Sequence, residues 1–430
     1  MAIRLDTRSA DFAQAFRAFL ATKRETSADV EATVRAIVDA VAARGDAALK
    51  EFTLKFDRLD LDRVGLKVTQ GEIAAAQNAC ARETLAALEF ARDRIETYHR
   101  RQLPRDDSFT DALGVELGSR WTAIEAVGLY VPGGTAAYPS SVLMNAVPAK
   151  VAGVPRLAMV VPAPGGALNP LVLAAAKLAG VDEIFRIGGA QAVAALAYGT
   201  DSIAPVAKIV GPGNAYVAAA KRIVFGKVGI DMIAGPSEVL IIADETGNTD
   251  WIAADLLAQA EHDASAQAIL ITDSKSLADA VERAVEGQLA HLPRQKVAGA
   301  SWRDFGGLIM VRSFDEALPL IDAIAPEHLE IATADAEALV PRIRNAGAIF
   351  IGAHTPEAIG DYVAGSNHVL PTARSARFSS GLGVLDFMKR TSLLKCGPDQ
   401  LRALGGAAMA LGAAEGLDAH ARSISIRLNR

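Results

Sequence analysis

The sequence is poor in cysteine and aromatic residues, and it lacks long apolar runs. Its two cysteines, Cys80 and Cys396, have neither a disulfide-framework nor a zinc-ribbon spacing, which fits a reducing compartment. With a net charge of -6 and no basic tract, nucleic-acid binding is not expected. No uncharged apolar run reaches the ~18 residues that span a bilayer. The N-terminus lacks the apolar core of a signal peptide, so we expect a cytoplasmic protein without membrane contact.

The aromatic share of 5% is offset by alanine, valine, leucine and isoleucine, which favours helices packed on parallel sheets. From residue 126 onward, segments typical of strands and helices alternate. The predicted strands are 127–131, 157–161, 183–187, 207–210, 238–243, 268–272, 308–311 and 348–351. The predicted helices are 142–152, 170–180, 190–198, 215–225, 251–260 and 277–289. The pattern predicts an α/β fold with two Rossmann-like, doubly wound, mostly parallel units that lack the GxGxxG fingerprint, plus helical N-terminal and C-terminal segments.

Changes of pattern along the chain suggest four parts. Residues 1–20 are predicted to form a helical N-terminal arm. Residues 21–129 together with 237–380 are assigned to a first α/β domain, because the early helices are expected to pack on the unit after residue 237. Residues 130–236 are assigned to a second α/β domain, and residues 381–430 to a C-terminal helical segment that ends in a β-prone tail.

The stretch from Ala325 to Glu330 connects an apolar helical run to a short strand. Pro326 favours the end of the helix, because proline fixes φ and lacks an N–H. Glu327 and His328 would then lie at a junction that can face a cleft, and they carry the two commonest proton-transfer groups. An isolated Glu-His pair is more often a plain surface loop, so the rest of the chain must carry the argument.

Three strands run into glycine-rich turns that open helices. These turns are Pro132-Gly133-Gly134, Gly188-Gly189-Ala190-Gln191 and Gly211-Pro212-Gly213-Asn214. Glycine lets a ligand approach the backbone, and helix N-termini attract phosphate. Each turn alone is more often an ordinary connection, but three in one unit favour a nucleotide site at strand ends.

Metal ligands are suggested only weakly by spacing. Gln259 and His262 lie at i and i+3 of a predicted helix and so share a face. Asp361 begins a polar, glycine-containing loop, and His420 follows Glu415 in the C-terminal segment. Nitrogen and oxygen ligands of this kind suit zinc or a similar divalent metal. There is neither an HExxH motif nor a cysteine pair.

Several long and unusual strings, in a fixed order, resemble the signature of the histidinol dehydrogenase family. They are 128–134, 138–146, 188–192, 211–214, 234–238, 259–263, 326–330 and 365–372. The resemblance runs from about residue 120 to the C-terminus, without a departure at a functional position.

The resemblance implies an NAD-dependent oxidoreductase that converts L-histidinol to L-histidine through an enzyme-held aldehyde, in the final steps of histidine biosynthesis. It implies one zinc ion per subunit, bound by Gln259, His262, Asp361 and His420. His328 would remove the hydroxyl proton, and Glu327 would deprotonate water. The implied substrate contacts are Ser237, Gln259, His262, His328, Asp361, Glu415 and His420. The implied NAD contacts are Tyr130, Gln191 and Asn214.

The family is a homodimer, so Glu415 and His420 would complete the site of the partner subunit. Two alternatives remain at this stage. In a zinc hydrolase, Glu327 would activate a metal-bound water and no NAD would be needed. A catalytically silent nucleotide-binding scaffold would not need Glu327, His328 or the metal ligands.

Overall fold

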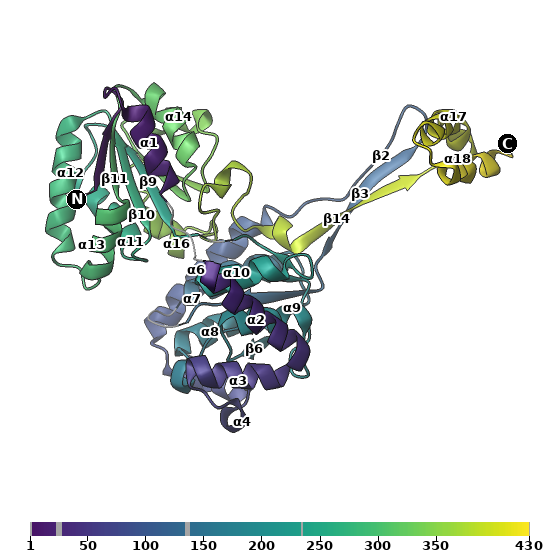
Figure 1. Cartoon of the computed structure of the whole chain (residues 1–430), viewed down its shortest axis with the longest axis horizontal. Helices are drawn as coiled ribbons and strands as arrows, with labels where there is room; N and C mark the ends of the chain where they lie inside the picture. Colours follow the sequence, from purple (N-terminus) through teal and green to yellow (C-terminus); the bar gives the residue numbers. More distant parts are fainter. Residues whose placement is uncertain (1, 23–27, 134–137, 234, 430) are drawn as a thin grey trace.

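The computed structural model describes residues 2–22, 28–133, 138–233 and 235–429. It comprises two lobes and a projecting arm (Figure 1). Each lobe is built on a parallel sheet with helices on both faces, as the sequence predicts. No helix in the described part of the chain combines the length and the apolar character needed to cross a membrane.

The five-stranded lobe has the strand order β6-β5-β4-β7-β8, and all its pairings are parallel. Its strands are β4 (Ala126–Tyr130), β5 (Arg156–Val160), β6 (Glu183–Phe185), β7 (Lys208–Val210) and β8 (Gly229–Ile230). One face is covered by α5 (Gln70–Ala79), α6 (Arg82–Arg100), α7 (Pro139–Val151) and α8 (Pro170–Leu178). The other is covered by α2 (Ala28–Arg44), α3 (Asp46–Asp57), α9 (Gly189–Tyr198) and α10 (Ala215–Val224). The short α4 (Leu61–Val64) and η1 (Pro164–Gly166) connect these helices and strands.

The early helices therefore belong to the five-stranded lobe, and their expected packing on the unit after residue 237 is wrong. Val34, Val38 and Val41 of α2 are fully buried against α9 and α10. Six of the ten residues of α9 are alanine or glycine, so a further helix can approach it closely. The boundary at residue 130 also falls inside this lobe, at the end of its central strand.

The six-stranded lobe has the order β1-β11-β10-β9-β12-β13, again entirely parallel. Its strands are β1 (Ile3–Asp6), β9 (Glu238–Ala243), β10 (Gln267–Thr272), β11 (Gly307–Met310), β12 (His328–Ala332) and β13 (Ala348–Ile351). Its helices are α1 (Phe12–Ala21), α11 (Thr249–Ala260), α12 (Lys275–Leu289), α13 (Gln295–Phe305), α14 (Phe314–Ile324), α15 (Ala336–Leu339) and α16 (Glu357–Tyr362), with the short η2 (Val340–Arg342) and η3 (Ser375–Arg377).

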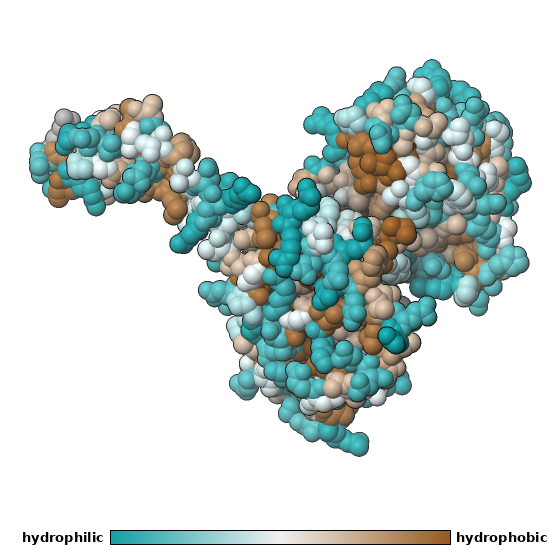
Figure 2. Space-filling model, turned by 180° about the vertical axis from the view of Figure 1, so that it is seen from behind, coloured by the Kyte–Doolittle hydropathy of each residue, from teal (hydrophilic) through white to brown (hydrophobic). Residues whose placement is uncertain are grey.

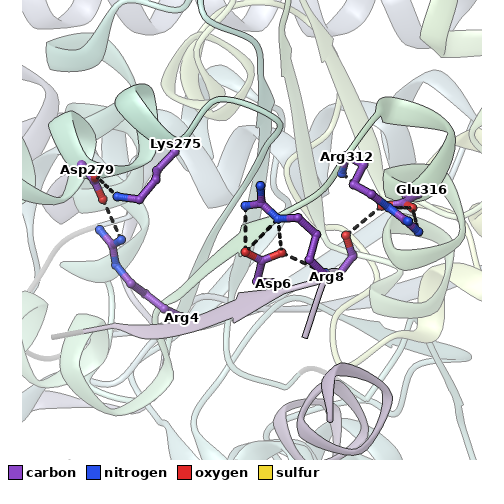
Figure 3. Close-up of polar contacts among 8 residues, drawn as sticks. Arg4, Asp6, Arg8, Lys275, Asp279, Arg312 and Glu316 are labelled. Atoms are coloured by element: carbon purple, nitrogen blue, oxygen red, sulfur yellow. Dashed lines mark hydrogen bonds and ion pairs between the residues drawn. The ribbon is translucent and has the colours of Figure 1, made fainter. Parts of the chain in front are cut away.

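The first residues do not form a separate helical arm, because β1 is an edge strand of this sheet and α1 packs on it. Polar contacts hold the strand on both sides (Figure 3). Arg4 binds Asp279 of α12 at 2.7 Å, and the Thr7 hydroxyl donates to Glu316 of α14 at 2.7 Å. Solvent screens the ion pair of Arg4 strongly, so these contacts mainly fix the position of the edge strand rather than its stability.

The arm is the part of the structure that the sequence predicts least well. The sequence predicts a helical segment over residues 381–430, but β14 (Met388–Lys395) pairs antiparallel with β3 (Glu116–Ala123), which pairs with β2 (Asp107–Thr110). The short η4 (Val384–Phe387) precedes β14, and α17 (Pro398–Ala414), α18 (Asp418–Ser425) and η5 (Ile426–Leu428) form the tip, so the expected β-prone tail is helical. Apolar surface is visible along the arm (Figure 2). The exposed apolar side chains of the arm include Leu394, which is 71% exposed, and Leu411, which is 65% exposed.

Candidate active site

The helix α14 ends where the sequence predicts. Ala325 adopts a left-handed conformation at φ 47°, and its N–H donates to the Ile321 carbonyl at 2.7 Å. Pro326 cannot extend the helix, so the chain turns into β12, which begins at His328. The predicted junction is therefore confirmed, but Glu327 and His328 are buried rather than exposed in a loop.

Glu327 and His328 are both oriented by the backbone of Glu238 at the start of β9. The Glu238 N–H donates to Glu327 Oε2 at 3.0 Å, and His328 Nδ1 lies 3.1 Å from the Glu238 carbonyl oxygen. A carbonyl only accepts hydrogen bonds, so Nδ1 carries a proton and donates it. In the neutral ring, Nε2 is then the free base, and it lies 3.7 Å from Asp361 Oδ1.

Buried carboxylates set the electrostatics around this imidazole. Burial raises the pKa of Glu327 to about 7. Burial alone would lower the pKa of His328, but the charges of Glu357, Glu327 and Asp361 outweigh it and raise that pKa well above its usual value. Glu357 Oε2 lies 3.8 Å from His328 Nδ1, and burial raises the pKa of Glu357 to about 8. Titratable groups perturbed in this way are typical of functional sites.

Side chains with free ligand atoms converge beside His328. Ligand atoms of His262, Glu357 and Asp361 all lie within 4.8 Å of one another. Both amide atoms of Gln259 are buried without a hydrogen-bond partner. Buried polar groups normally have partners, so the two amide atoms are available to bind a ligand. This set of imidazole, carboxylate and amide donors suits a metal cation that prefers nitrogen and oxygen ligands.

Glu357 is a site residue that the sequence analysis missed. It precedes Asp361 by four positions on α16, so the two carboxylates share a helix face, but this i,i+4 spacing carries information only once the helix is known. The Glu357 N–H is held by Glu330 Oε1 at 2.7 Å. Glu330 in turn interacts with Asp255, whose pKa burial raises to about 6. A chain of interacting carboxylates therefore runs from Glu357 in the site through Glu330 to Asp255 on α11 of the six-stranded lobe.

The residues predicted to contact a nucleotide lie at the carboxyl edge of the five-stranded sheet, at or after the ends of β4, β6 and β7. The Tyr130 hydroxyl accepts the Gly189 N–H at 2.9 Å, and burial raises the pKa of Tyr130 to about 12. Gln191 lies in the first turn of α9 and is 2% exposed. Asn214 caps α10, because its Oδ1 accepts from the N–H groups of Tyr216 and Val217 at 3.1 and 3.2 Å. Of the first glycine turn, residues 134–137 lie outside the described residues.

The turn after β7 is held by a buried ion pair. Gly211 adopts φ +113°, and its N–H donates to Asp231 Oδ2 at 2.8 Å. Its carbonyl accepts from Lys221 Nζ at 3.1 Å, and Lys221 also pairs with Asp231. A Cβ at Gly211 would lie 2.1 Å from the Tyr130 carbonyl oxygen, so only glycine fits here.

The carboxylate–imidazole cluster and the predicted nucleotide contacts lie at different edges of their sheets, one at strand starts and the other at strand ends. His328 starts β12 and Glu238 starts β9, so the carboxylate–imidazole cluster lies at the amino edge of the six-stranded sheet. The loop after α16 connects this edge to the other lobe. Arg94 of α6 donates to the carbonyls of Val363 and Ala364 at 2.7 and 2.9 Å. His368 lies 2.9 Å from the Asp361 carbonyl and 3.3 Å from the hydroxyl of Ser141, which lies in the first turn of α7.

The structure does not bring every predicted site residue together within one chain. Ser237 directly precedes Glu238 and lies beside the cluster. Glu415 and His420 lie on the arm, at the end of α17 and in α18, and they are exposed (Figure 1). The arm projects away from the two lobes, so these residues do not reach the cluster of their own chain.

Fold and site together define an α/β enzyme with a buried acid–base pair beside a candidate metal site and a doubly wound nucleotide-type lobe. The family model described as histidinol dehydrogenase matches residues 20–428. The chain is 77% identical over 429 residues to histidinol dehydrogenases from Nitrobacter winogradskyi and Bradyrhizobium diazoefficiens, and covers 100% of each. The crystal structure of histidinol dehydrogenase from Elizabethkingia anophelis is similar at a TM-score of 0.95 and 34% identity, with 100% of this chain and 98% of that chain covered. This chain therefore belongs to the histidinol dehydrogenase family, a family of oxidoreductases, and the suspected resemblance is confirmed.

Proposed function

We propose that this chain oxidises L-histidinol through L-histidinal to L-histidine, with NAD as the hydride acceptor and one zinc ion per subunit. The observation that carries the proposal is the juxtaposition of Glu327 and His328 with the ligand cluster of His262, Glu357 and Asp361. Family membership supports the same substrate, and histidine biosynthesis is the corresponding pathway. The cytoplasmic location stays a prediction.

The metal ligands are proposed to be Gln259, His262, Asp361 and the partner subunit's His420. The unpartnered amide of Gln259 and the clustering of His262 with Asp361 support this set. Zinc, when bound, supplies a Lewis acid that can hold the imidazole and amino nitrogens of the substrate in a fixed orientation. Ser237, His328 and Glu415 are the further proposed substrate contacts.

The acid–base roles follow from the hydrogen bonds of the pair. Because His328 Nδ1 donates to the Glu238 carbonyl, Nε2 is the atom that removes the hydroxyl proton in the first oxidation. The negative charge of Asp361 and Glu357 favours imidazolium in this arrangement, and cation binding by Asp361 would counter that effect. NAD, when bound, accepts the hydride that leaves the substrate carbon in each oxidation.

Glu327 is proposed to act on water. Its Oε2 is held by the Glu238 N–H, and its pKa of about 7 lies near the working pH, which suits a general base. It removes a proton from the water whose oxygen adds to the aldehyde carbon, which gives the hydrate anion. This anion loses the second hydride to NAD and becomes the carboxylic acid, which then releases a proton to give the carboxylate. Burial of the pair keeps other water away from the aldehyde.

The nucleotide is proposed to bind at the carboxyl edge of the five-stranded sheet. Tyr130, Gln191 and Asn214 lie there with the glycine turns, and the chain order reverses between β4 and β7, which is where such folds bind dinucleotides. The positive φ angles of Gly189 and Gly211, 65° and 113°, leave the backbone open to a phosphate at these turns.

A homodimer with shared sites is proposed from the arm. Its long strands and terminal helices expose apolar side chains, and it carries Glu415 and His420 far from the cluster of its own chain. Docking of the arm on a second copy would cover this surface and complete each metal site.

The first test is histidinol-dependent NADH formation, measured by absorbance before and after chelation. We expect NADH formation that chelation removes and zinc restores. No histidinol-dependent NADH formation, or full activity after chelation, would refute the proposal. Metal analysis of His262→Asn should show loss of zinc, whereas stoichiometric zinc in that variant would exclude His262 as a ligand.

The second test mixes two inactive variants, His262→Asn and His420→Asn. If each site takes His262 from one chain and His420 from the other, subunit exchange should restore about a quarter of the sites for random pairing. Each variant mixed with itself is the control. Exchange without recovered activity would show that every chain builds its own site.

A further inference from the structure

The segment that follows β5 in the five-stranded sheet, residues 161–166, contains no acidic residue, although doubly wound folds usually place one there. In such folds, an Asp or Glu near the end of the second strand of the unit binds the adenine ribose of NAD. The second strand here is β5, and it is followed by Val161, Pro162 and Ala163. The turn η1 that follows contains only proline and glycine. A ribose-binding carboxylate must therefore come from another segment.

Asp57, the last residue of α3, lies at this edge. The helix α3 contacts both η1 and α9, which leave β5 and β6 respectively. A Cβ at Gly166 of η1 would lie 3.3 Å from Leu59 Cδ1, so the chain directly after Asp57 packs against this turn. Asp57 is also close enough to Tyr130 for its charge to raise the pKa of the Tyr130 hydroxyl. That hydroxyl binds Gly189, where α9 begins.

The position is energetically unfavourable for a carboxylate that serves only the fold. Asp57 Oδ2 is buried without a hydrogen-bond partner, and burial raises the pKa of the group. The C-terminal end of a helix carries negative partial charge, which disfavours an anion there. Within the described residues, Asp57 makes neither an ion pair nor a hydrogen bond through its side chain. An unpaired, half-buried carboxylate beside a binding edge is typical of a group kept for a ligand.

The chemistry of this carboxylate selects its ligand. Because no ion pair among the described residues neutralises it, this carboxylate can accept hydrogen bonds from neutral O–H donors, and the 2′- and 3′-hydroxyls of a ribose supply two of them. A phosphate on the 2′-oxygen would instead bring a like charge into a poorly solvated place. We propose that Asp57 accepts hydrogen bonds from the adenine ribose of NAD and thereby excludes NADP. This inference rests on the proposed NAD site at this edge.

Binding of nucleotide fragments tests the inference apart from catalysis. Calorimetric titration of the full chain should show tighter binding of ADP-ribose than of 2′-phospho-ADP-ribose. Because hydrogen bonds to a charged group are strong, Asp57→Asn should weaken ADP-ribose binding by about 10- to 100-fold and reduce the discrimination against the 2′-phosphate. Asp39→Asn removes the same charge from an exposed position on the neighbouring α2, and both affinities should stay unchanged.

The outcomes separate this inference from the proposed function. Suppose that wild-type protein reduces NAD but Asp57→Asn binds ADP-ribose and 2′-phospho-ADP-ribose with wild-type affinities. This result would overturn the role of Asp57 and leave the proposed function intact. If the variant fails to fold, wild-type protein still decides, because 2′-deoxy-ADP-ribose should bind about tenfold more weakly than ADP-ribose. Equal binding of these two compounds would refute a ribose-binding carboxylate. Wild-type protein that neither binds ADP-ribose nor reduces NAD would refute the nucleotide site itself, and this inference with it.

Discussion

The buried pair of Lys221 and Asp231 should be one of the most sensitive points of the five-stranded lobe. Their side chains are 3% and 1% exposed, and together they hold both the N–H and the carbonyl of Gly211. Asp231 also accepts the Met232 N–H at 2.7 Å. The change Asp231→Asn keeps the shape and removes the charge. It leaves the Lys221 ammonium buried without its counter-ion.

Loss of one partner of a buried pair typically costs about 3–5 kcal/mol. In a lobe of this size each kcal/mol lowers the melting temperature by about 2–4 °C, so a drop of about 6–20 °C is expected. The effect should also reach the nucleotide site, because the constrained turn at Gly211 would lose its support. We therefore expect weaker ADP-ribose binding together with the lower stability, measured by calorimetry and by denaturant unfolding.

Two further variants make this prediction specific. Asp62→Asn breaks the ion pair of Asp62 with Lys50, whose side chains are 70% and 50% exposed respectively, and should leave the melting temperature nearly unchanged because solvent screens this pair. Adding Lys221→Met to Asp231→Asn removes the stranded charge and should recover part of the stability. The reasoning would be refuted if Asp231→Asn were as mild as Asp62→Asn.

Three other changes have equally definite expected outcomes. Glu327→Gln should form roughly one NADH per site from histidinol in a single turnover and then stall, because loss of a general base costs about 10²–10⁴-fold on the step it serves; equal loss on both oxidations would contradict a dedicated water base. Burial raises the pKa of Asp255 from 3.8 to about 6, so its ionisation costs stability above pH 6 and nothing below pH 3.8. The pKa shift corresponds to at most ~3 kcal/mol, which we halve for solvent screening, so Asp255→Asn should raise the free energy of unfolding by about 1–2 kcal/mol at pH 8. An unchanged free energy of unfolding at pH 8, measured with denaturant, would exclude this linkage. Gly211→Ala should destabilise the protein far more than Gly226→Ala, since both glycines have positive φ but a Cβ at Gly226 meets nothing within 4 Å; similar melting temperatures would contradict the close contact.

The sequence predicts the lobes well because each element there is specified locally. Buried strands read as short apolar runs, and glycine or proline marks the turns between them. What the sequence does not specify is the partner of an amphipathic helix. The apolar face of α2 requires burial, but nothing in its periodicity distinguishes the two sheets. The strand β14 was missed for a related reason, since Met388–Lys395 is mostly exposed and is stabilised by pairing with β3 rather than by apolar alternation.

The sequence predicts the part of the candidate site whose residues have a characteristic chemical role, such as proton transfer. Glu327 and His328 stand out as a pair at an element junction, whereas the importance of Glu357 depends on a helix whose existence the sequence did not predict. Asp57 carries no sequence signal at all. Its environment arises only when α3 packs beside η1 and α9, and that packing was assigned to the wrong lobe.

The two lobes have the same strand-order reversal, between β4 and β7 in one and between β9 and β12 in the other, but they present opposite edges to the site. The carboxyl edge of the five-stranded sheet offers glycine turns and helix N-termini, which suit phosphates. The amino edge of the six-stranded sheet instead receives the end of α11 and the residues before β9 and β12. These segments carry the side chains that could bind a metal and move protons. The hydride donor and acceptor must meet, so the proposed reaction needs the carboxyl edge of the five-stranded sheet to face the amino edge of the six-stranded sheet. Hydrogen bonds from Asp361 through His368 to Ser141 connect the two lobes.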